Sequence, residues 1–367
     1  MSFSGSYRCG EVEFLLTPLQ AQEFTSVLEK ERLIQSGQRH YSQMLSPESV
    51  PSARYMAVFE DACRANNARM AQDCLQLAGL IAARREGEIT LVSLARAGTP
   101  VGVVVVRLLR EVFGRQAVHY SVSIVRDRGL DCAALRHILD QGHRGESIVF
   151  LDGWTGKGVI ARELALSVSA FNAAQGTSID GGLYVLSDLA GAAACAASGE
   201  DYLIPSSILN ATVSGLVSRT VLDERIGPQD FHGCVYYGES AQGGFVAADQ
   251  SQRFADALVA LAIARAASGL SAPEALDATL AGERSRAYLA RAMAGYDIAD
   301  INLIKPGIGE ATRVLLRRVP RLLVLRQPGA ADVAHLQVLA EEKQVPVEID
   351  PALPYHAVSL IRSALDG

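Results

Sequence analysis

The sequence predicts an α/β protein in which a parallel β-sheet carries helices on both faces and a small α/β domain follows. Short apolar strands alternate with helical stretches between residues 88 and 186, and this alternation is typical of a parallel sheet. Of the 367 residues, 49% are hydrophobic and 20% are charged, which is enough apolar material for complete cores and excludes a disordered chain. A second alternation over the last ~55 residues is at the lower limit of domain size.

The predicted elements begin with helices, one over residues 18–35 and a longer one over 52–85, where apolar side chains such as Phe59 and Met70 recur at helical spacing. Residues 249–292 are rich in alanine and are also expected to be helical. In the first alternation, strands are predicted at 88–94, 117–125, 148–151 and 184–186, with helices at 101–113, at 132–139 and from about residue 159. In the second, a strand is predicted at 322–325, a helix at 331–343 and a strand at 345–349.

A change in composition at residues 304–309 separates the two alternations. We therefore expect a helical, hood-like N-terminal region at 1–86, a sheet domain with a helical extension at 87–311, and a C-terminal domain at 312–367.

The net charge of −6 and the isoelectric point of about 5.7 argue against a general nucleic-acid-binding surface. A local basic stretch remains near the C-terminus, where Arg313, Arg317, Arg318 and Arg321 lie close together in sequence. This stretch is either a phosphate-binding surface or a solvated helix face with salt bridges between domains.

None of the six cysteines lies in a C-x-x-C or another metal-ligand spacing, and in a chain this long and this apolar they predict a reducing compartment. We expect reduced core thiols in a cytoplasmic protein. The first ten residues lack the apolar segment of a signal peptide, and no run approaches the roughly 20 apolar residues of a membrane helix. The cysteines are Cys9, Cys63, Cys74, Cys132, Cys195 and Cys234.

The segment from Ser147 to Gly158 is the most informative part of the chain. An apolar strand ends at Asp152, a glycine-rich turn follows, and a helix begins near Val159. Glycines let backbone N–H groups surround phosphate oxygens, and a helix N-terminus adds a positive dipole. The segment satisfies neither G-x-x-x-x-G-K-[ST] nor G-x-G-x-x-G, and an ordinary turn between a strand and a helix also uses glycine.

Two more loops follow strands of the same predicted sheet, so we expect them at the same edge. The first covers residues 93–100 and contains Arg96 and Gly98, and the second covers the charged residues 126–131. Together with Asp152–Gly158, these loops suit a polyphosphate ligand held partly through Mg²⁺, which binds phosphate oxygens and few carboxylates.

A strand, an Arg-Ala-Gly turn, a charged loop and a strand followed by Asp-x-x-Thr-Gly together resemble the type I phosphoribosyltransferases. The whole chain more closely resembles the phosphoribosyltransferase family of bacterial tellurium-resistance and stress operons, which is also labelled "cysteine protease StiP" and ends in a Pelota-like RNA-binding domain. The stretches that carry this resemblance are 124–129, 152–158, 201–206, 214–220 and 305–310.

The resemblance implies a type I phosphoribosyltransferase-like sheet and an Mg²⁺-dependent enzyme that joins phosphoribosyl pyrophosphate to a nucleobase-like acceptor. It also implies RNA binding by the C-terminal domain and a homodimer, as in many relatives. In type I enzymes two adjacent acids usually precede Thr-Gly, whereas Gly153 occupies the second position here.

The resemblance further implies roles for individual residues, none of which is expected to bind the metal directly. For each group the alternative is structural: a strand-end turn, a helix N-cap at Thr155, a packing hydroxyl or a solvated charged loop. The ribose 5-phosphate group is Asp152, Gly153, Thr155, Gly156, Lys157 and Gly158, the pyrophosphate group is Arg96, Ala97 and Gly98, and the catalytic group is Arg126, Arg128 and Asp131. The acceptor pocket is Ser206, Asn210, Ser214 and Arg219, and the RNA contacts are Arg313, Arg317 and Arg318.

Two other functions are compatible with the sequence: a non-catalytic nucleotide- or RNA-binding stress protein, and a cysteine protease. A protease needs a thiol beside a base. Cys132 lies five residues before His137, and Cys234 lies two residues after His232. Catalytic pairs form in space, however, and neither cysteine has a recognisable nucleophile motif.

Overall fold

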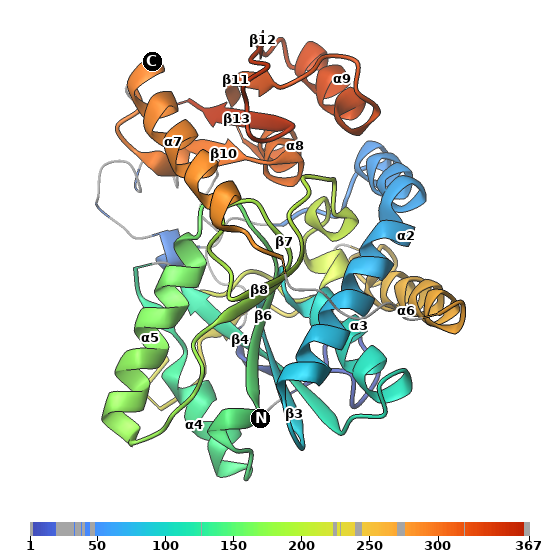
Figure 1. Ribbon diagram of the computed structural model, residues 1–367, viewed down its shortest axis with the longest axis vertical. Helices are drawn as coiled ribbons and strands as arrows, with labels where there is room; N and C mark the ends of the chain where they lie inside the picture. The colour runs from blue at the N-terminus through green and yellow to red at the C-terminus, as the bar shows by residue number, and fades with distance from the viewer. Residues whose placement is uncertain are drawn as a thin grey trace.

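The computed structural model describes residues 3–19, 33, 38, 41–44, 48–125, 127–222, 226–227, 229–238, 244–269, 276–318 and 320–362. Most of the helix predicted at 18–35, and Arg126 of the second loop, lie outside these residues. A large sheet lies between two layers of helices, and a smaller α/β unit sits above its upper edge (Figure 1). The predicted fold class, a parallel sheet with flanking helices and a small C-terminal α/β domain, is confirmed.

The strands of the large sheet follow the order β1-β4-β3-β6-β7-β8, with every neighbouring pair parallel, and the short β5 pairs antiparallel with β4. Helices bury both faces of the central strands, which explains their nearly continuous apolar sequence. Parallel strands bring their carboxyl ends to one edge, where the predicted loops meet. The strands are β1 Glu13–Leu15, β3 Ile89–Ala95, β4 Ala117–Val125, β5 Gly129–Leu130, β6 Ile148–Thr155, β7 Leu183–Asp188 and β8 Cys195–Ser198, while β2 Thr17–Pro18 and β9 Gly233–Cys234 form a separate parallel pair.

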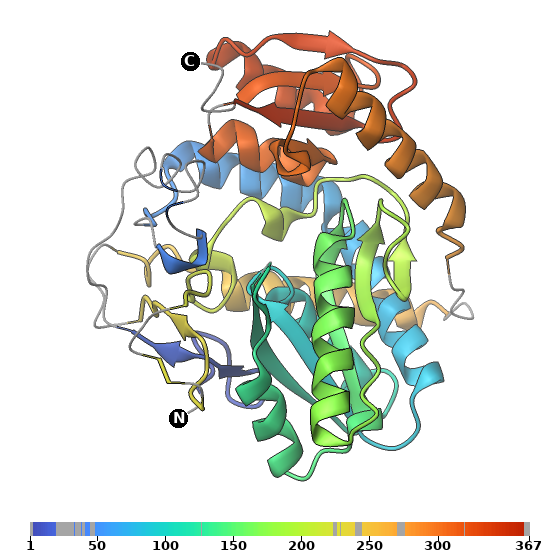
Figure 2. The ribbon, with the colours of Figure 1, turned by 90° about the vertical axis from the view of Figure 1, so that its left-hand side faces the viewer.

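Helices cover both faces of the sheet (Figures 1 and 2). One face carries α2 (Ala53–Arg84), α3 (Thr99–Glu111) and α6 (Ser251–Ala267), and the other carries α4 (Cys132–Asp140) and α5 (Val159–Gln175). The valines of α3 are fully buried, because this helix lies between the sheet and the other two helices of its face. Short 3₁₀ helices are η1 Tyr41–Gln43, η2 Gly145–Ser147, η3 Pro205–Ser207, η4 Ala211–Val213, η5 Ile301–Leu303 and η6 Ala331–Val333.

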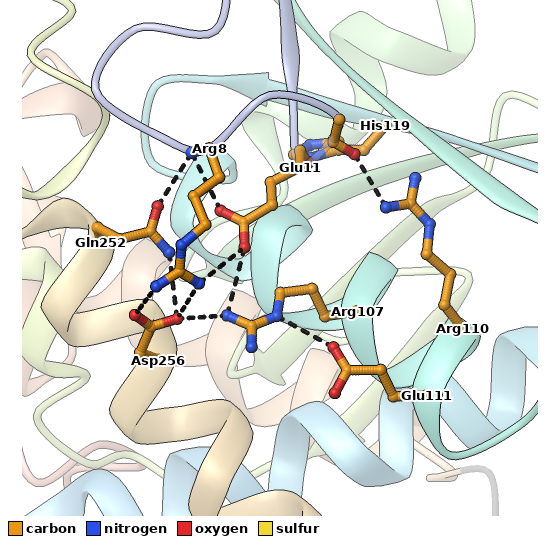
Figure 3. A network of polar contacts seen from close by, with 9 residues as sticks. Arg8, Glu11, Arg107, Arg110, Glu111, His119, Gln252 and Asp256 are labelled. Atoms are coloured by element: carbon orange, nitrogen blue, oxygen red, sulfur yellow. Dashed lines mark hydrogen bonds and ion pairs between the residues drawn. The ribbon is translucent and has the colours of Figure 1, made fainter.

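An ionic cluster ties the N-terminal segment to α3 and α6 (Figure 3). Arg8 forms a bidentate pair with Asp256 of α6, with N–O distances of 2.8 and 2.7 Å. Arg107 of α3 donates to the same carboxylate at 2.6 Å and lies 3.4 Å from Glu11. A bidentate guanidinium–carboxylate pair adds a defined geometry to the attraction of the charges. Residues 8–11 are therefore held in one position against α3 and α6.

His119 of β4 is fully buried beside this cluster. Its Nδ1 lies 2.9 Å from the carbonyl oxygen of Glu11, and its Nε2 lies 2.8 Å from Oγ of Ser93. Burial lowers the pKa of His119 to about 4, so the ring is neutral near pH 7 and bridges the N-terminal segment to the sheet.

Gly102 of α3 makes room for this imidazole. A Cβ atom at this position would lie 2.2 Å from Nε2 of His119 and 2.5 Å from its Cε1. We expect Gly102→Ala to lower the free energy of unfolding by about 2 kcal/mol, because overpacking a rigid core outweighs the gain of about 1 kcal/mol in helix propensity. Urea unfolding measures the change. Gly295→Ala in α7, where nothing lies within 4 Å of the new Cβ, is the control, and equal stability of Gly102→Ala and wild type would contradict the prediction.

The C-terminal unit is built on the strand order β10-β13-β11-β12. Tyr288 and Leu289 of α7 pack against Val324 and Val358 on one face of this sheet, and α8 and α9 cover the other face. The apolar side of α8 lies in the same cluster as Ile204, so this helix also belongs to the core of the larger unit. The elements are α7 Thr279–Gly295, β10 Ile304–Pro306, α8 Ile308–Arg317, β11 Pro320–Leu325, α9 Ala334–Glu342, β12 Val347–Ile349 and β13 Ala357–Ile361.

Three of the differences between the structure and the expectations from sequence concern the domain boundary, β6 and the cysteines. The boundary expected between residues 311 and 312 lies inside α8, although the division into domains itself stays a prediction. Strand β6 continues to Thr155, because its residues beyond Leu151 pair with β7. Cys9 and Cys132 are exposed, so the expectation of core thiols is wrong for these two.

Over the described part of the chain, no helix combines the length and the apolar character needed to cross a membrane.

Candidate functional site

The Asp152–Gly158 segment lies under the C-terminal unit. Nζ of Lys157 donates to the carbonyl oxygens of Ile301 and Ile304, at 2.9 Å each. A Cβ atom on Gly156 would lie 3.3 Å from Pro306 of β10. The lysine expected to hold a phosphate therefore binds main-chain carbonyls of the C-terminal unit.

Two N–H groups of the same segment are bonded within it. Gly158 donates to Oγ1 of Thr155 at 3.0 Å, and Gly153 donates to Oδ1 of Asp152 at 2.8 Å. Thr155 therefore accepts a hydrogen bond from Gly158, the residue directly before α5. This contact is similar to the helix N-cap that was the structural alternative for Thr155. Asp152 is half-buried, and burial raises the pKa of its carboxyl to about 7, although Gly153 and Arg313 act in the opposite direction.

The raised pKa of Asp152 makes stability depend on pH. The pKa of this carboxyl is 3.8 in its ordinary state and about 7 in the folded protein. Between these two values the folded protein binds more protons at this site than the unfolded chain does, so its stability falls as the pH rises toward and through 7. We expect Asp152→Asn to raise the free energy of unfolding by about 2 kcal/mol at pH 8, because the amide is neutral, and to have little effect at pH 4.

Urea unfolding of both proteins at the two pH values measures this difference. Asp61→Asn is the matched control, since the side chain of Asp61 is 68% exposed. A stability difference between Asp152→Asn and wild type that is the same at pH 4 and pH 8 would count against the prediction.

The first loop is also tied to the protein. The guanidinium of Arg96 forms an ion pair with Glu48, donates to Oδ1 of Asn210 at 2.6 Å and contacts the carbonyl oxygen of Val217 at 3.4 Å. The structure therefore brings together Arg96, expected at the pyrophosphate, and Asn210, expected in the acceptor pocket. Gly98 donates its N–H to Leu94 at 3.0 Å.

The other predicted residues are distributed around this edge. The carbonyl oxygen of Ala97 lies 3.6 Å from the Cβ position of Gly153, so the first and third loops are adjacent. Ser214 donates to the carbonyl oxygen of Asn210 at 2.8 Å. Arg219 donates to the carbonyl oxygen of Met44. Ser206 is buried, and its Oγ has no hydrogen-bond partner among the described residues. Arg128 is exposed in the turn after β4.

The basic stretch is partly used inside the protein. Arg313 pairs with Glu310 at 3.2 Å and lies 5.9 Å from the centre of the Trp154 ring. Arg318 is exposed, and the side chain of Arg317 lies outside the described part of the structure. No group of three or more His, Cys, Asp or Glu side chains within the described ranges is arranged to hold a metal ion, and the expected Mg²⁺ stays a prediction.

Asp131 connects the second loop to a distant part of the chain. It is buried and forms the N-cap of α4, where Oδ1 accepts from Ala133 at 3.0 Å and from Ala134 at 3.1 Å. Its Oδ2 accepts from the backbone N–H of His232 at 2.7 Å, across a separation of 101 residues. The start of α4 and the backbone of His232 are therefore fixed to one carboxylate.

The imidazole of His232 lies at the same place. Its Nδ1 is 2.8 Å from Oγ of Ser123 on β4, and its Nε2 has no hydrogen-bond partner among the described residues. Burial lowers the pKa of His232 below 6.5, against the opposing effect of Asp131, so the ring is neutral near pH 7. The preceding Phe231 packs edge-on against His137 of α4, with ring centres 5.4 Å apart.

Cys132 is the first residue of α4 and is exposed. It follows Asp131 directly, so its Cα lies ~3.8 Å from that of Asp131. Its thiol contacts the carbonyl oxygen of Leu130 at 3.6 Å, and burial raises the pKa of this thiol. The resting thiol is therefore protonated at neutral pH and needs a base to become a nucleophile.

Cys234 has a different environment. It is fully buried, and burial raises the pKa of its thiol to about 12. Neither of the pairs suggested by sequence, Cys132 with His137 and Cys234 with His232, is joined by a hydrogen bond among the described residues. The structure instead places the exposed thiol of Cys132 beside the residue that holds His232.

Comparisons with known proteins match both parts of the chain. Residues 5–259 match the family model described as "Tellurite-like stress resistance cysteine protease StiP", and residues 283–363 match that of the "PELOTA RNA binding domain". A protein named "Cysteine protease StiP" from Acinetobacter baylyi is 40% identical over 376 residues, which cover 100% of this chain and 96% of that protein. No solved structure matches.

These matches overturn the predicted phosphoribosyltransferase activity, because both the family and the full-length relative are named as a cysteine protease. The resemblance to the StiP stress-resistance family and to the Pelota RNA-binding domain is confirmed, whereas the predicted phosphoribosyl pyrophosphate and nucleobase have no support. The chain belongs to the StiP family of tellurite-like stress resistance proteins.

Proposed function

We propose that this protein is a cysteine-dependent peptidase in which Cys132 is the nucleophile and His232 is the base. The observation that carries the proposal is the arrangement at the N-terminus of α4. One buried carboxylate, that of Asp131, precedes the exposed thiol and holds the backbone of His232. The names of the family and of the Acinetobacter baylyi relative support the same class of reaction.

The chemistry follows from the states of the two side chains. The ring of His232 is neutral, and Ser123 occupies Nδ1, so Nε2 is the atom that takes the thiol proton. The sulfur of Cys132 then attacks the carbonyl carbon of a peptide bond, the amine leaves with the proton from His232, and water releases the acyl group. The position at the N-terminus of α4 places the helix dipole where negative charge develops.

Alkylation tests the proposal directly. The full-length protein is incubated with fluorescent casein before and after treatment with iodoacetamide, and the modified cysteine is located by mass spectrometry. We expect iodoacetamide to stop casein cleavage in step with modification of Cys132. The control is Cys9→Ala, which removes the other exposed thiol and should leave both cleavage and its inhibition unchanged. Cleavage that persists after complete modification of Cys132, or wild type that cleaves no casein, would refute the proposal.

We also propose that the C-terminal unit binds RNA, as the match of residues 283–363 to the Pelota domain suggests. The basic stretch supports this second function, because Arg318 is exposed and Arg321 is half-buried on the same unit. Fluorescence anisotropy with a structured RNA measures binding. Reversing both charges should weaken binding and reduce its dependence on salt, whereas Arg144→Glu, at a side chain 82% exposed on the larger unit, should not. Equal affinity for all three proteins would exclude this stretch as the binding surface.

A further inference from the structure

We infer that Asp131 is a positioning residue that fixes the base of the proposed site relative to the helix carrying the nucleophile. This inference rests on the proposed function. All described hydrogen bonds of the Asp131 carboxylate are to backbone N–H groups of α4 and His232. Asp131 therefore acts on the proposed reaction only through His232 and α4.

The two oxygens of Asp131 have separate tasks. Oδ1 accepts from the first turn of α4, at Ala133 and Ala134, and Oδ2 accepts from His232 at 2.7 Å. The residue is only 2% exposed. In such a buried place a charge-assisted hydrogen bond is short and strong, and an unpaired N–H is costly, so the chain at His232 is held at a defined distance from α4.

A cap alone does not require this residue type. Serine, asparagine and aspartate cap helices about equally well, with one oxygen accepting from the first turn. The bond to His232 needs a second acceptor, pointing away from the helix, which serine lacks and which asparagine replaces with a donor. The carboxylate therefore carries a task beyond the stability of α4.

Besides the ring contact of Phe231 with His137 of α4, two further hydrogen bonds of the described residues hold this dipeptide. The carbonyl oxygens of Phe231 and His232 accept from Thr17, at 2.9 Å each. These bonds anchor the segment to the N-terminal strand β2 and not to α4. Among the described backbone bonds of this dipeptide, the one to Asp131 links it to the helix that bears Cys132.

The test separates capping from positioning. In Asp131→Ser the cap of α4 is kept and the bond to His232 is lost, and Asp131→Asn loses the same bond. Casein cleavage gives kcat and KM, and ¹³C-histidine NMR of the full chain reports the ring of His232, assigned by its absence in His232→Gln. Ser52→Ala is the matched control, because it removes the N-cap of α2 away from the site.

We expect both variants to shift or broaden the His232 resonance and to lower kcat about tenfold to a hundredfold with KM unchanged, since small displacements of a catalytic group have effects of this size. Ser52→Ala should change neither. A His232 resonance unchanged in Asp131→Ser would overturn the inference whatever the activity. If wild type cleaves no casein, the proposed function fails, and the resonance alone decides the positioning role.

Discussion

A Cys132→Ala protein is expected to cleave casein at least about 10³-fold more slowly than wild type, and His232→Gln is expected to show a loss of similar size. In the proposed mechanism the two side chains act as one unit: without the thiol there is no nucleophile, and without the imidazole the protonated thiol has no acceptor for its proton. A loss of this size corresponds to about 4 kcal/mol of transition-state stabilisation. Initial rates of casein cleavage at roughly neutral pH provide the measurement.

Two substitutions on neighbouring residues test whether the loss is specific. His137→Gln alters the other histidine near Cys132, whose ring packs on Phe231, and Cys234→Ser alters the buried thiol. We expect both proteins to retain activity within about tenfold of wild type, since the proposed proton transfer uses neither side chain. A His137→Gln protein as inactive as His232→Gln would mean that the base has been assigned to the wrong histidine.

The sequence was sufficient to predict the parallel sheet because the pattern is local. Strand β4 has the bounds that were predicted, and α2 differs by a single residue at each end. Elements that depend on distant partners were missed. One is strand β13 (Ala357–Ile361), which pairs with β10 and β11. Strand β10 and the start of α8 were interpreted as a boundary between domains, because Gly307 and Gly309 interrupt the apolar pattern there.

The third loop shows why a motif alone misled. Asp-Gly-Trp-Thr has the composition of a turn, yet Asp152 and Trp154 pair with β7 and extend the strand. Lys157 has the chemistry of a phosphate ligand, yet it binds two carbonyl oxygens of a unit that begins more than a hundred residues later. The side-chain types agreed with the resemblance to phosphoribosyltransferases, and the family match contradicts that activity.

The residues of the proposed thiol site were partly visible in the sequence. Cys132, His137, Cys234 and His232 were all noted, but spacing paired each cysteine with the nearer histidine. The hydrogen bond between the backbone N–H of His232 and Asp131 instead associates His232 with Cys132, the residue after Asp131. Asp131 directly before a predicted helix is a recognisable N-cap signal, whereas nothing local indicates that its second oxygen reaches a residue 101 positions away.

Asp201→Ala is expected to lower the free energy of unfolding by about 3 kcal/mol at pH 5. The side chain is buried, with Oδ1 accepting from Ile308 and Oδ2 from His356, at 2.8 Å each. Ile308 is the first residue of α8, and His356 precedes β13. Alanine leaves the buried N–H group of Ile308 and the partly buried N–H group of His356 without this acceptor, at a cost of about 1–3 kcal/mol for a buried group, and α8 loses its N-terminal acceptor.

The size of this effect should depend on pH. Burial raises the pKa of Asp201 to about 6, although its hydrogen bonds with Ile308 and His356 act to lower it. A carboxyl with a raised pKa contributes stability at low pH that is lost as the pH rises through 6. We therefore expect the stability difference between wild type and Asp201→Ala to be smaller at pH 8 than at pH 5, as measured by urea unfolding at both.

Asp350→Ala is the matched control within the C-terminal unit, because among the described residues its carboxylate accepts hydrogen bonds from Ala352 and Arg291 of that same unit. We expect a loss of about 1 kcal/mol there. Equal losses for the two variants would show that the contact between the units adds nothing to stability. A larger loss for Asp201→Ala would mean that the contact between the units stabilises the fold, in agreement with the shared core around α8. For the same reason RNA binding is better tested by substitution than by removing residues 312–367, since that cut divides α8 and exposes the core of both units.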